Sequence, residues 1–209
     1  MITVAEHPLL DLYTCRARWP SSLGEIQTPE WLSALCELSA QTPFSLPDDA
    51  HKVVVRDLLR HGGFKPAGRS KPCWEYIRRV AEKGNFPRIN PAVDATNAAC
   101  MHGAVPVSTV DLDRLTGPLR VDIAPAGARY VFNASGQEID LSGLLCLFDA
   151  NGPCANSVKD SQRAKTTDET TRTLTLVWGT VALPGRGASV ASWYSDILSR
   201  LGAAIEEEV

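Results

Sequence analysis

The residues best suited to chemistry lie together near the middle of the sequence. The stretch NPAVDATNAACMHGAVPVSTVDLDRL places two carboxylates, Asp94 and Asp111, close in sequence to two amides, Asn90 and Asn97, and to the hydroxyl of Ser108. Carboxylates and hydroxyls can transfer protons or orient water, and amides can hold a polar ligand. These residue types therefore fit a catalytic pocket, a binding pocket or a well-capped part of the core.

A helix and the turn after it must position these side chains. Asn90, followed by a proline, is typical of a helix N-terminus, and Gly103 is typical of a helix end. Asp94 and Asn97 then lie three residues apart on one helix face, where they either satisfy buried backbone groups or contact a ligand. Asp111 either caps a short helix over DLDRL or belongs to the pocket.

Positive charge is concentrated just before this stretch. The 209-residue chain has a formal net charge of -3, but residues 51–90 contain ten Lys or Arg residues and three acids, a net charge of +7. Such a segment attracts phosphate backbones, although two solvated helix faces would have the same composition. Glu75 could also hold Arg79 in an i,i+4 pair. The candidate phosphate contacts are Lys65, Arg69, Lys71, Arg78 and Arg79.

Composition and missing motifs narrow the class of protein. The chain is 44% hydrophobic and 22% charged, as in a soluble protein with a sizeable core, and no apolar run approaches the roughly 20 residues of a membrane span. With no secretory start, we expect a cytoplasmic protein without a membrane partner. The six cysteines are scattered without a Cys-x-x-Cys pair, so we expect free thiols and no zinc. No nucleotide-binding loop occurs, and we expect no cofactor and no metal.

Helical periodicity comes first along the chain and strand patterns come later. We expect a strand at 1–5 and helices at 28–40, 47–63, 71–84 and 90–103, with Thr28 and either Asp48 or Asp49 as caps. Strands are expected at 118–124, 129–133, 143–148 and 173–183, the last with one buried face. A final helix should follow within 187–205, before a solvated tail at 206–209. This order indicates an α+β fold.

Three stretches carry a resemblance to a known family: GGFKPAGRSKPCWEYIRRV, FPRINPAVDATNAACMHGAVPVSTVDLDRLTGPLRVDIA and KDSQRAKTTDETTRTLTLVWG. Together they span roughly residues 49–181 and resemble the B3/B4 domain of the phenylalanyl-tRNA synthetase β-subunit. The resemblance is closer to free-standing proteins that consist of that domain alone. Its most specific part is the helix-capping Asn-Pro, the Val-Asp-x-x-Asn inside the helix and the Pro-x-x-x-x-Asp-Leu-Asp turn.

The resemblance implies a fold and a function. The fold would be a β-sandwich of unusual topology flanked by helices, formed by residues 49–209, with residues 1–48 as an appended strand and helix. In the synthetase, this domain edits by hydrolysing tyrosine wrongly esterified to the phenylalanine tRNA. The implied partner is thus tRNA or aminoacyl-tRNA, and the implied role is aminoacyl-tRNA editing in translation quality control.

The family's editing residues carry over only in part. Synthetase domains place a pocket histidine in Pro-x-His-x-x-Asp, where this chain has Ser108. A synthetase arginine before the motif helix falls at Pro87 or beside it at Arg88. A late-strand glutamate falls near Thr175 or Leu176, so no carboxylate matches it. The tyrosine-specific chemistry therefore does not transfer with the fold.

Two functions remain open from the sequence. An aminoacyl ester is already activated, so Ser108 and Thr109 could orient water for hydrolysis without a histidine. Alternatively, the chain is a non-catalytic module that binds tRNA or an amino-acid-like ligand. Lys159 belongs with Asp160 and Arg163 to a polar loop of the kind that often carries function. The expected substrate-pocket residues are Arg88, Asn90, Asp94, Asn97, Asp160 and Arg163.

Overall fold

The computed structural model of the chain describes residues 2–84 and 86–206. The α-helices are α1 (Glu30–Leu35), α2 (Asp49–Arg60), α3 (Cys73–Ala81), α4 (Pro91–Gly103) and α5 (Arg186–Arg200). The strands of the first half are β1 (Ile2–Val4), β2 (Leu10–Arg18), β3 (Val107–Asp111), β4 (Leu119–Ile123) and β5 (Arg129–Val131). The later strands are β6 (Glu138–Asp140), β7 (Leu145–Asp149), β8 (Gly152–Asn156), β9 (Arg172–Thr180) and β10 (Ala204–Glu206).

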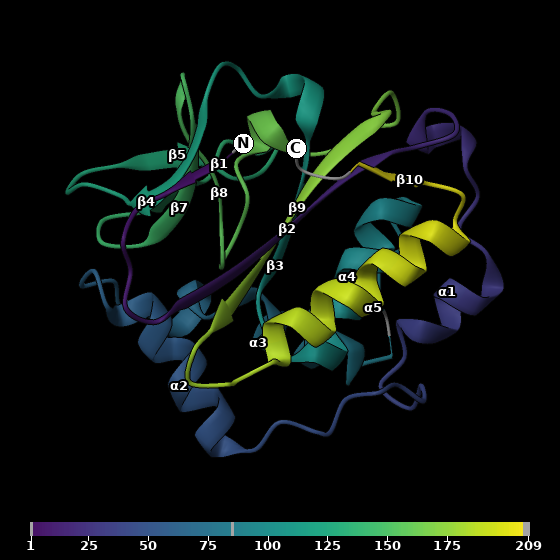
Figure 1. Cartoon of the computed structure of the whole chain (residues 1–209), viewed down its shortest axis with the longest axis horizontal. Helices are drawn as coiled ribbons and strands as arrows, with labels where there is room; N and C mark the ends of the chain where they lie inside the picture. The colour runs from purple at the N-terminus through teal and green to yellow at the C-terminus, as the bar shows by residue number, and fades with distance from the viewer. Residues whose placement is uncertain (1, 85, 207–209) are drawn as a thin grey trace.

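Two four-stranded sheets form a sandwich. One has the order β10-β2-β9-β3 and the other the order β1-β4-β7-β8, while β5 and β6 form a separate two-stranded ribbon. The pairs are antiparallel except β1 and β4, which run parallel. In Figure 1, β2 and β9 run as long neighbouring strands across the middle of the molecule. The α+β class and the helix-flanked sandwich are confirmed.

The core between the sheets follows the two-residue period of a strand. Leu174, Leu176 and Trp178 of β9 are almost fully buried and belong to one cluster with Val121 of β4 and Leu147 of β7. Burying each such side chain contributes about 1.5–3 kcal/mol. This cluster joins the two sheets.

Helices cover the other face of the β10-β2-β9-β3 sheet. There α4 and α5 pack against each other, with α5 lying over β2 and β9 and α4 over β3 (Figure 1). The threonines of β9 face this layer, so the expectation of a single buried face is wrong: Thr173 and Thr175 are 0% exposed. Their hydroxyls are satisfied, because Thr173 accepts from Trp19 Nε1 at 3.1 Å and Thr175 pairs with Tyr194 Oη at 2.9 Å.

The predicted helix caps are mostly confirmed. Asp48 accepts from His51 N at 2.8 Å, and Asn90 accepts from Val93 N at 3.0 Å. The first helix is an exception, since it begins at Glu30. Thr28, its expected cap, instead donates to a carboxylate of α4, that of Asp94, at 3.0 Å. Thr28 thus forms a tertiary hydrogen bond in place of the expected bond to the backbone of its own helix.

The segment from 106 to 111, expected as a turn, contributes strand β3 to the sheet. All five residues of β3 are buried, with Val107 opposite Val177 and Asp111 opposite Thr173 of β9. A continuous buried strand has no polar alternation, which removes the pattern that usually marks a strand.

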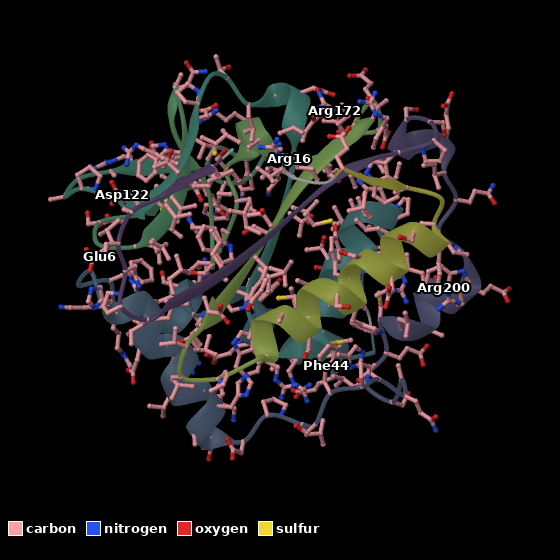
Figure 2. All side chains as sticks on the ribbon, in the orientation of Figure 1. Glu6, Arg16, Phe44, Asp122, Arg172 and Arg200 are labelled. Carbon is pink, nitrogen blue, oxygen red and sulfur yellow. The ribbon has the colours of Figure 1, made fainter. Side chains whose placement is uncertain are left out.

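The first 48 residues contribute strands to both main sheets. β1 pairs with β4, and β2 lies between β10 and β9. Of the expected tail, Glu206 belongs to β10 and accepts from Arg172 Nη2 at 3.5 Å (Arg172 is labelled in Figure 2), whereas 207–209 lie outside the described residues. In the described part of the chain, every helix is too short or too polar to cross a membrane.

Candidate functional site

A cleft of about 1320 Å³ opens between α3 with the loop before it, the β5–β6 ribbon and the loop after β8. Its walls come mainly from three stretches of sequence, near residues 63–79, 132–142 and 158–165, and Asn97 of α4 also lines it. Six cations line it: Lys65, Arg69, Lys71, Arg79, Lys159 and Lys165. The four carboxyl groups in the lining are Glu75, Glu138, Asp140 and Asp160.

Tertiary contacts hold α3 and its basic loop at the cleft. Trp74 is buried in the core under α4, and the N–H of Cys73 donates to Ser157 O at 2.9 Å. Glu75 forms a bidentate pair with Arg56 of α2 at 2.7 and 2.5 Å. The expected pairing of Glu75 with Arg79 is absent from the ion pairs of the described residues, so Arg79 remains directed to the cleft.

Three cations from two walls of the cleft crowd together, with Lys159 close to the charges of Arg69 and Lys165. Burial, followed by the charges of Arg69 and Lys165, lowers the pKa of Lys159. Burial also lowers the pKa of Lys165, although the charge of Asp160 opposes it. The Lys159 Nζ atom lies 4.0 Å from the ring centroid of Phe132, and Lys165 Nζ donates to the Phe132 carbonyl at 2.6 Å. Crowded, partly desolvated cations favour an anionic ligand.

Asn156 organises the loop that carries two of these groups. Its side-chain oxygen accepts from the backbone N–H of Val158 at 2.7 Å and of Lys159 at 2.9 Å, while its Nδ2 donates to Tyr130 Oη. Its backbone N–H donates to Asp160 Oδ1 at 3.2 Å. Asn156 itself is 1% exposed. A buried amide therefore fixes the position of the carboxyl group at the cleft.

Asp160 is the most perturbed carboxyl group of the lining. Burial raises its pKa from 3.8 to about 7, against the opposing effects of the Ser108 hydroxyl, the Asn156 N–H and the charge of Lys165. Desolvation disfavours the carboxylate because water can no longer solvate the charge. The group therefore changes protonation close to neutral pH.

Ser108 and Thr109, the predicted catalytic residues, are buried and are not among the cleft-lining residues. Ser108 Oγ donates to Asn156 O at 2.8 Å and accepts from Trp178 Nε1 at 3.0 Å. Thr109 points to the helix layer, where it forms hydrogen bonds with Thr96 and Thr175 at 2.5 and 2.8 Å. Successive residues of β3 face opposite sides, so only Ser108 lies behind the cleft loop.

The predicted pocket residues divide into two groups. Asn97 and Asp160 line the cleft. Arg88 instead donates to Ser33 O at 2.6 Å beside α1, and Asp94 accepts from Ile89 N at 3.2 Å. Asp94 is 0% exposed and also accepts from Thr28 Oγ1 at 3.0 Å, which supports a structural role for this carboxyl group.

The two remaining polar groups of the motif stretch, Asn90 and Asp111, cap the N-termini of helices. Besides capping α4, Asn90 donates to Thr166 Oγ1 at 3.3 Å. Asp111 accepts from Asp113 N at 3.0 Å, which confirms the capping interpretation, and from Thr170 Oγ1 at 2.6 Å. Both side chains therefore connect the motif stretch to the segment before β9.

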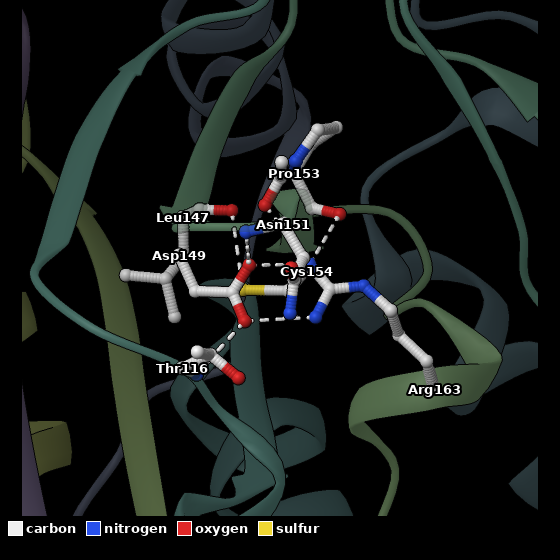
Figure 3. Close-up of polar contacts among 8 residues, drawn as sticks. Thr116, Leu147, Asp149, Asn151, Pro153, Cys154 and Arg163 are labelled. Carbon is white, nitrogen blue, oxygen red and sulfur yellow. Dashed lines mark hydrogen bonds and ion pairs between the residues drawn. The ribbon is translucent and has the colours of Figure 1, made fainter.

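Arg163, also predicted for the pocket, is paired with the buried carboxylate of Asp149 (Figure 3). Burial alone would raise the pKa of Asp149. Hydrogen bonds from Arg163 and from the backbone of Thr116 and Asn151 hold that pKa below its ordinary value. Asp149 is thus an ionised structural anchor at the end of β7.

The five predicted phosphate contacts likewise divide into residues that line the cleft and one that does not. Lys65, Arg69, Lys71 and Arg79 line the cleft, and the first three are exposed on the loop that leads into α3. Arg78 lies on another face of the helix and donates to Met101 O at 3.3 Å. Four of the five cations are therefore brought together.

Sequence reasoning missed the aromatic part of the cleft and one of its lysines. Tyr76 is 60% exposed, and the Arg79 guanidinium carbon lies 5.7 Å from its ring centroid. An exposed aromatic residue beside the inward-facing Trp74 and Ile77 was the available signal. Phe132 and Lys165 carried none, because only the fold brings them to α3.

The cysteines and acids of the described residues form no group able to hold a metal ion. All six cysteines are free and five are buried, while Cys73 is partly exposed at the cleft. Cys73 Sγ lies 3.4 Å from Cys100 Sγ. The site is thus built from cations, aromatic rings and one perturbed carboxyl group.

Comparison with known proteins identifies the sequence family of the chain and a solved structure with a similar fold. Residues 66–179 match the model of the B3/4 domain. A crystal structure of an N-terminal fragment of the phenylalanyl-tRNA synthetase β-subunit from Pyrococcus horikoshii superposes with a TM-score of 0.50 at 12% identity. The alignment covers 98% of this chain and 50% of the fragment, so this chain spans about half of its length. No curated protein matches the chain in sequence.

Proposed function

Because the chain belongs to the B3/4 domain family, we propose that its cleft binds the aminoacylated 3′ end of a tRNA and hydrolyses the ester of a mischarged aminoacyl-tRNA. The family match and the shared fold relate the chain to a module of the synthetase β-subunit. The activity would be that of a trans-editing deacylase in translation quality control. Its substrate is a polyanion with an exposed single-stranded end.

The observation that carries this proposal is the crowding of Arg69, Lys159 and Lys165 in one cleft. Their mutual repulsion is relieved when a phosphate or carboxylate occupies the space between them. Lys65, Lys71 and Arg79 extend the positive surface along the same opening. A ligand with several consecutive phosphates uses such a surface better than a single small anion does.

Tyr76 supports a nucleic-acid ligand. Its ring is exposed at the cleft, and the guanidinium of Arg79 lies nearby. Unpaired bases stack on aromatic side chains, and each such contact contributes ~1–3 kcal/mol. The 3′ end of a tRNA offers unpaired bases next to the aminoacyl group, so a cleft lined by Tyr76 and by cations suits it.

The interior of the cleft has the polar groups that ester hydrolysis needs. Asn97 and Asp160 line it, and Ser108 lies directly behind the loop that carries Asp160. Hydrolysis of an activated ester depends chiefly on a positioned water and on stabilisation of the oxyanion. Ser108 and Thr109 would act on the substrate only through other groups, since both are buried.

A non-catalytic binding module is the second candidate. The burial of Ser108 and Thr109, together with the replacement of the family's histidine by Ser108, favours it. Such a module would hold tRNA or an amino-acid-like ligand in the same cleft. When the ligand is tRNA, the two candidates differ only in turnover.

A deacylation assay over a panel of misacylated tRNAs, run beside tRNA binding at several salt concentrations, tests the proposal. We expect turnover above the buffer rate for at least one pair, and binding that weakens steeply with salt as counterions are released. Replacing Lys159 and Lys165 with Gln should weaken binding and make the slope of log affinity against log salt shallower by about one per lost phosphate contact.

The matched control is Arg200→Gln, which removes an exposed cation on α5, away from the cleft (Figure 2). It should leave binding and its salt dependence unchanged. Binding without turnover by any pair would support the non-catalytic module. Negligible tRNA binding at low salt would exclude the deacylase and the tRNA-binding module, and would leave a module that binds an amino-acid-like ligand.

A further inference from the structure

Among the carboxyl groups of the cleft, Asp160 is the one whose surroundings suit proton transfer. Glu75 is held by Arg56 in a bidentate pair. Asp140 is exposed and accepts from the Ser142 N–H and hydroxyl at 2.9 and 2.6 Å, which lowers its pKa. Glu138 is exposed and lies 3.7 Å from Arg129. Each of these three carboxyl groups is therefore already engaged by an arginine or by Ser142.

The Asp160 carboxyl group is held by the core on one side and faces the cleft on the other. The Asn156 N–H donates to Oδ1 at 3.2 Å, and the side chain lines the cleft. Asn156 is fixed in turn by Tyr130 and by the backbone of the loop. A carboxyl group held in this way meets a ligand or water from the cleft side with little loss of entropy.

Ser108 is the link between Asp160 and the core. Its Oγ accepts from Trp178 Nε1 at 3.0 Å and donates to Asn156 O at 2.8 Å, and the same hydroxyl lowers the pKa of Asp160. A hydroxyl has a single proton, so Ser108 can donate to only one of the Asn156 carbonyl and the Asp160 carboxylate at a time. Ser108 is therefore placed to tune Asp160 rather than to touch substrate.

We infer that Asp160 is the general base of the deacylation reaction, with Ser108 and Asn156 as positioning residues. This inference rests on the proposed function. Asp160 takes a proton from a water molecule as the water oxygen bonds to the ester carbonyl carbon. The tetrahedral intermediate then collapses, the bond from carbon to the ribose oxygen breaks, and the ribose oxygen receives the proton from Asp160. The products are a free amino acid and an uncharged tRNA.

The groups around Asp160 make its protonation the event that controls activity near neutral pH. Its titratable neighbours are Lys165, Tyr130, Cys100, Cys146 and Cys154. Burial raises the pKa of the tyrosine and of all three cysteines, so these groups are uncharged at pH 7. The charge of Lys165 stabilises the carboxylate form. The activity should therefore rise with pH through the pKa of Asp160, about 7.

The experiment compares Asp160→Asn with Asp140→Asn, a matched removal of a second carboxylate from the same cleft. We expect Asp160→Asn to lower the single-turnover deacylation rate by about 10²–10⁴-fold and to keep tRNA affinity. Asp140→Asn should lower the rate far less than Asp160→Asn does. Unfolding curves of both variants establish that they fold.

A pH profile separates a positioning role from a merely structural one. Removing the Ser108 hydroxyl in Ser108→Ala takes away a hydrogen bond that lowers the Asp160 pKa, so the acidic limb of the profile should move to higher pH. Asp160→Glu, which keeps a carboxyl group, should retain more activity than Asp160→Asn and give a displaced limb.

Each outcome is decisive. Turnover by the parent protein that persists in Asp160→Asn overturns the role of Asp160 and leaves the proposed function standing. An unmoved limb in Ser108→Ala overturns the positioning role of Ser108. A parent protein that binds tRNA but deacylates none overturns the general base together with the enzymatic part of the proposed function.

Discussion

Arg163 and Asp149 form a bidentate ion pair that ties the 3-10 helix at Gln162–Ala164 to the end of β7. The guanidinium nitrogens donate to the two carboxylate oxygens at 2.8 and 2.7 Å. The Asp149 side chain is 0% exposed, and Arg163 also donates to Gly152 O at 2.9 Å. The arginine predicted to contact substrate thus neutralises a buried charge just outside the cleft (Figure 3).

Replacing Arg163 with Met should therefore destabilise the protein. The change leaves the Asp149 carboxylate buried without its cation, which costs about 3–5 kcal/mol in comparable cases. The free energy of unfolding in urea measures the loss. Arg60→Met is the control, because the Arg60–Asp57 pair at 2.6 Å has both side chains 48% exposed and should contribute less than about 1 kcal/mol.

The same pair has a pH signature. The pKa of Asp149 is lowered in the folded state, so its stabilisation is present above the unfolded-state pKa and is lost as the pH falls through the folded value. Arg163→Met should reduce this acid-dependent contribution. Equal unfolding free energies for Arg163→Met and Arg60→Met would contradict the assignment of Arg163 as a structural cation.

Asp160 should contribute to stability with the opposite sign. Its pKa is raised from 3.8 to about 7 on folding, so ionising it disfavours the folded state. Near pH 3.8, the unfolded-state pKa, Asp160→Asn should have the same free energy of unfolding as the parent. The variant should become progressively more stable than the parent between that pH and about 7, and the difference should then remain constant. The plateau should lie at roughly 2–4 kcal/mol, because each tenfold change in an ionisation constant corresponds to about 1.36 kcal/mol.

Urea unfolding of Asp160→Asn and its parent across this pH range gives the difference directly. Asp140→Asn is again the control, and its effect on stability should have the opposite sign. Hydrogen bonds from Ser142 lower the pKa of Asp140, so removing this carboxylate should slightly lower the free energy of unfolding at neutral pH. A stability difference for Asp160→Asn that does not depend on pH would show that the carboxyl group is not desolvated as described.

Local sequence signals predicted the caps and the amphipathic helices, because these depend on neighbours within four residues. Asp48, Asn90 and Asp111 accept the backbone hydrogen bonds that their positions indicate. Strand β2 carried no comparable signal. Its partners are β9, with Leu10 opposite Thr180, and β10 at the other end of the chain. Pairing over such separations is set by the whole fold.

The sequence indicated two separate segments of the cleft wall but not that they lie together. The basic loop before α3 and the polar loop around Asp160 were both visible, but Lys165 and Phe132 join Arg69 only through tertiary structure. The resemblance aligns Ser108 with a histidine of the synthetase domains, but the structure directs Ser108 toward Trp178 and Asn156. A motif therefore located the neighbourhood of the site without identifying which side chain reaches the cleft.

Cys73 should be the first of the six cysteines to react with a maleimide. It is partly exposed at the cleft, whereas the other five are buried. Burial also raises the pKa of Cys36 to about 11 and of Cys154 to about 12, which suppresses their reactive thiolates. Mass spectrometry of the native protein should find one rapid adduct, and Cys73→Ser should abolish it. Rapid labelling of any other cysteine would contradict this packing.

The last prediction concerns the contact that fixes the two walls of the cleft. Gly62, just after α2, and Gly143, just before β7, approach so closely that a Cβ on Gly143 would lie 2.2 Å from Gly62 O. A Cβ on Gly62 would likewise lie 2.3 Å from Gly143 O. Both carbonyl oxygens belong to the backbone, so neither of these clashes can be relieved by rotating a side chain. The neighbouring Gly63 and Ser142 line the cleft.

Gly143→Ala should therefore destabilise the protein more than its backbone conformation alone explains. Gly143 has φ 74° and Gly136 has φ 76°, but a Cβ on Gly136 would meet nothing within 4 Å. Gly136→Ala thus measures the cost of an alanine in the left-handed region, on the order of 1 kcal/mol. We expect Gly143→Ala to exceed that by about 1–3 kcal/mol in urea unfolding, as for other overpacked sites. Equal losses for the two variants would mean that the walls of the cleft are not held by this backbone contact.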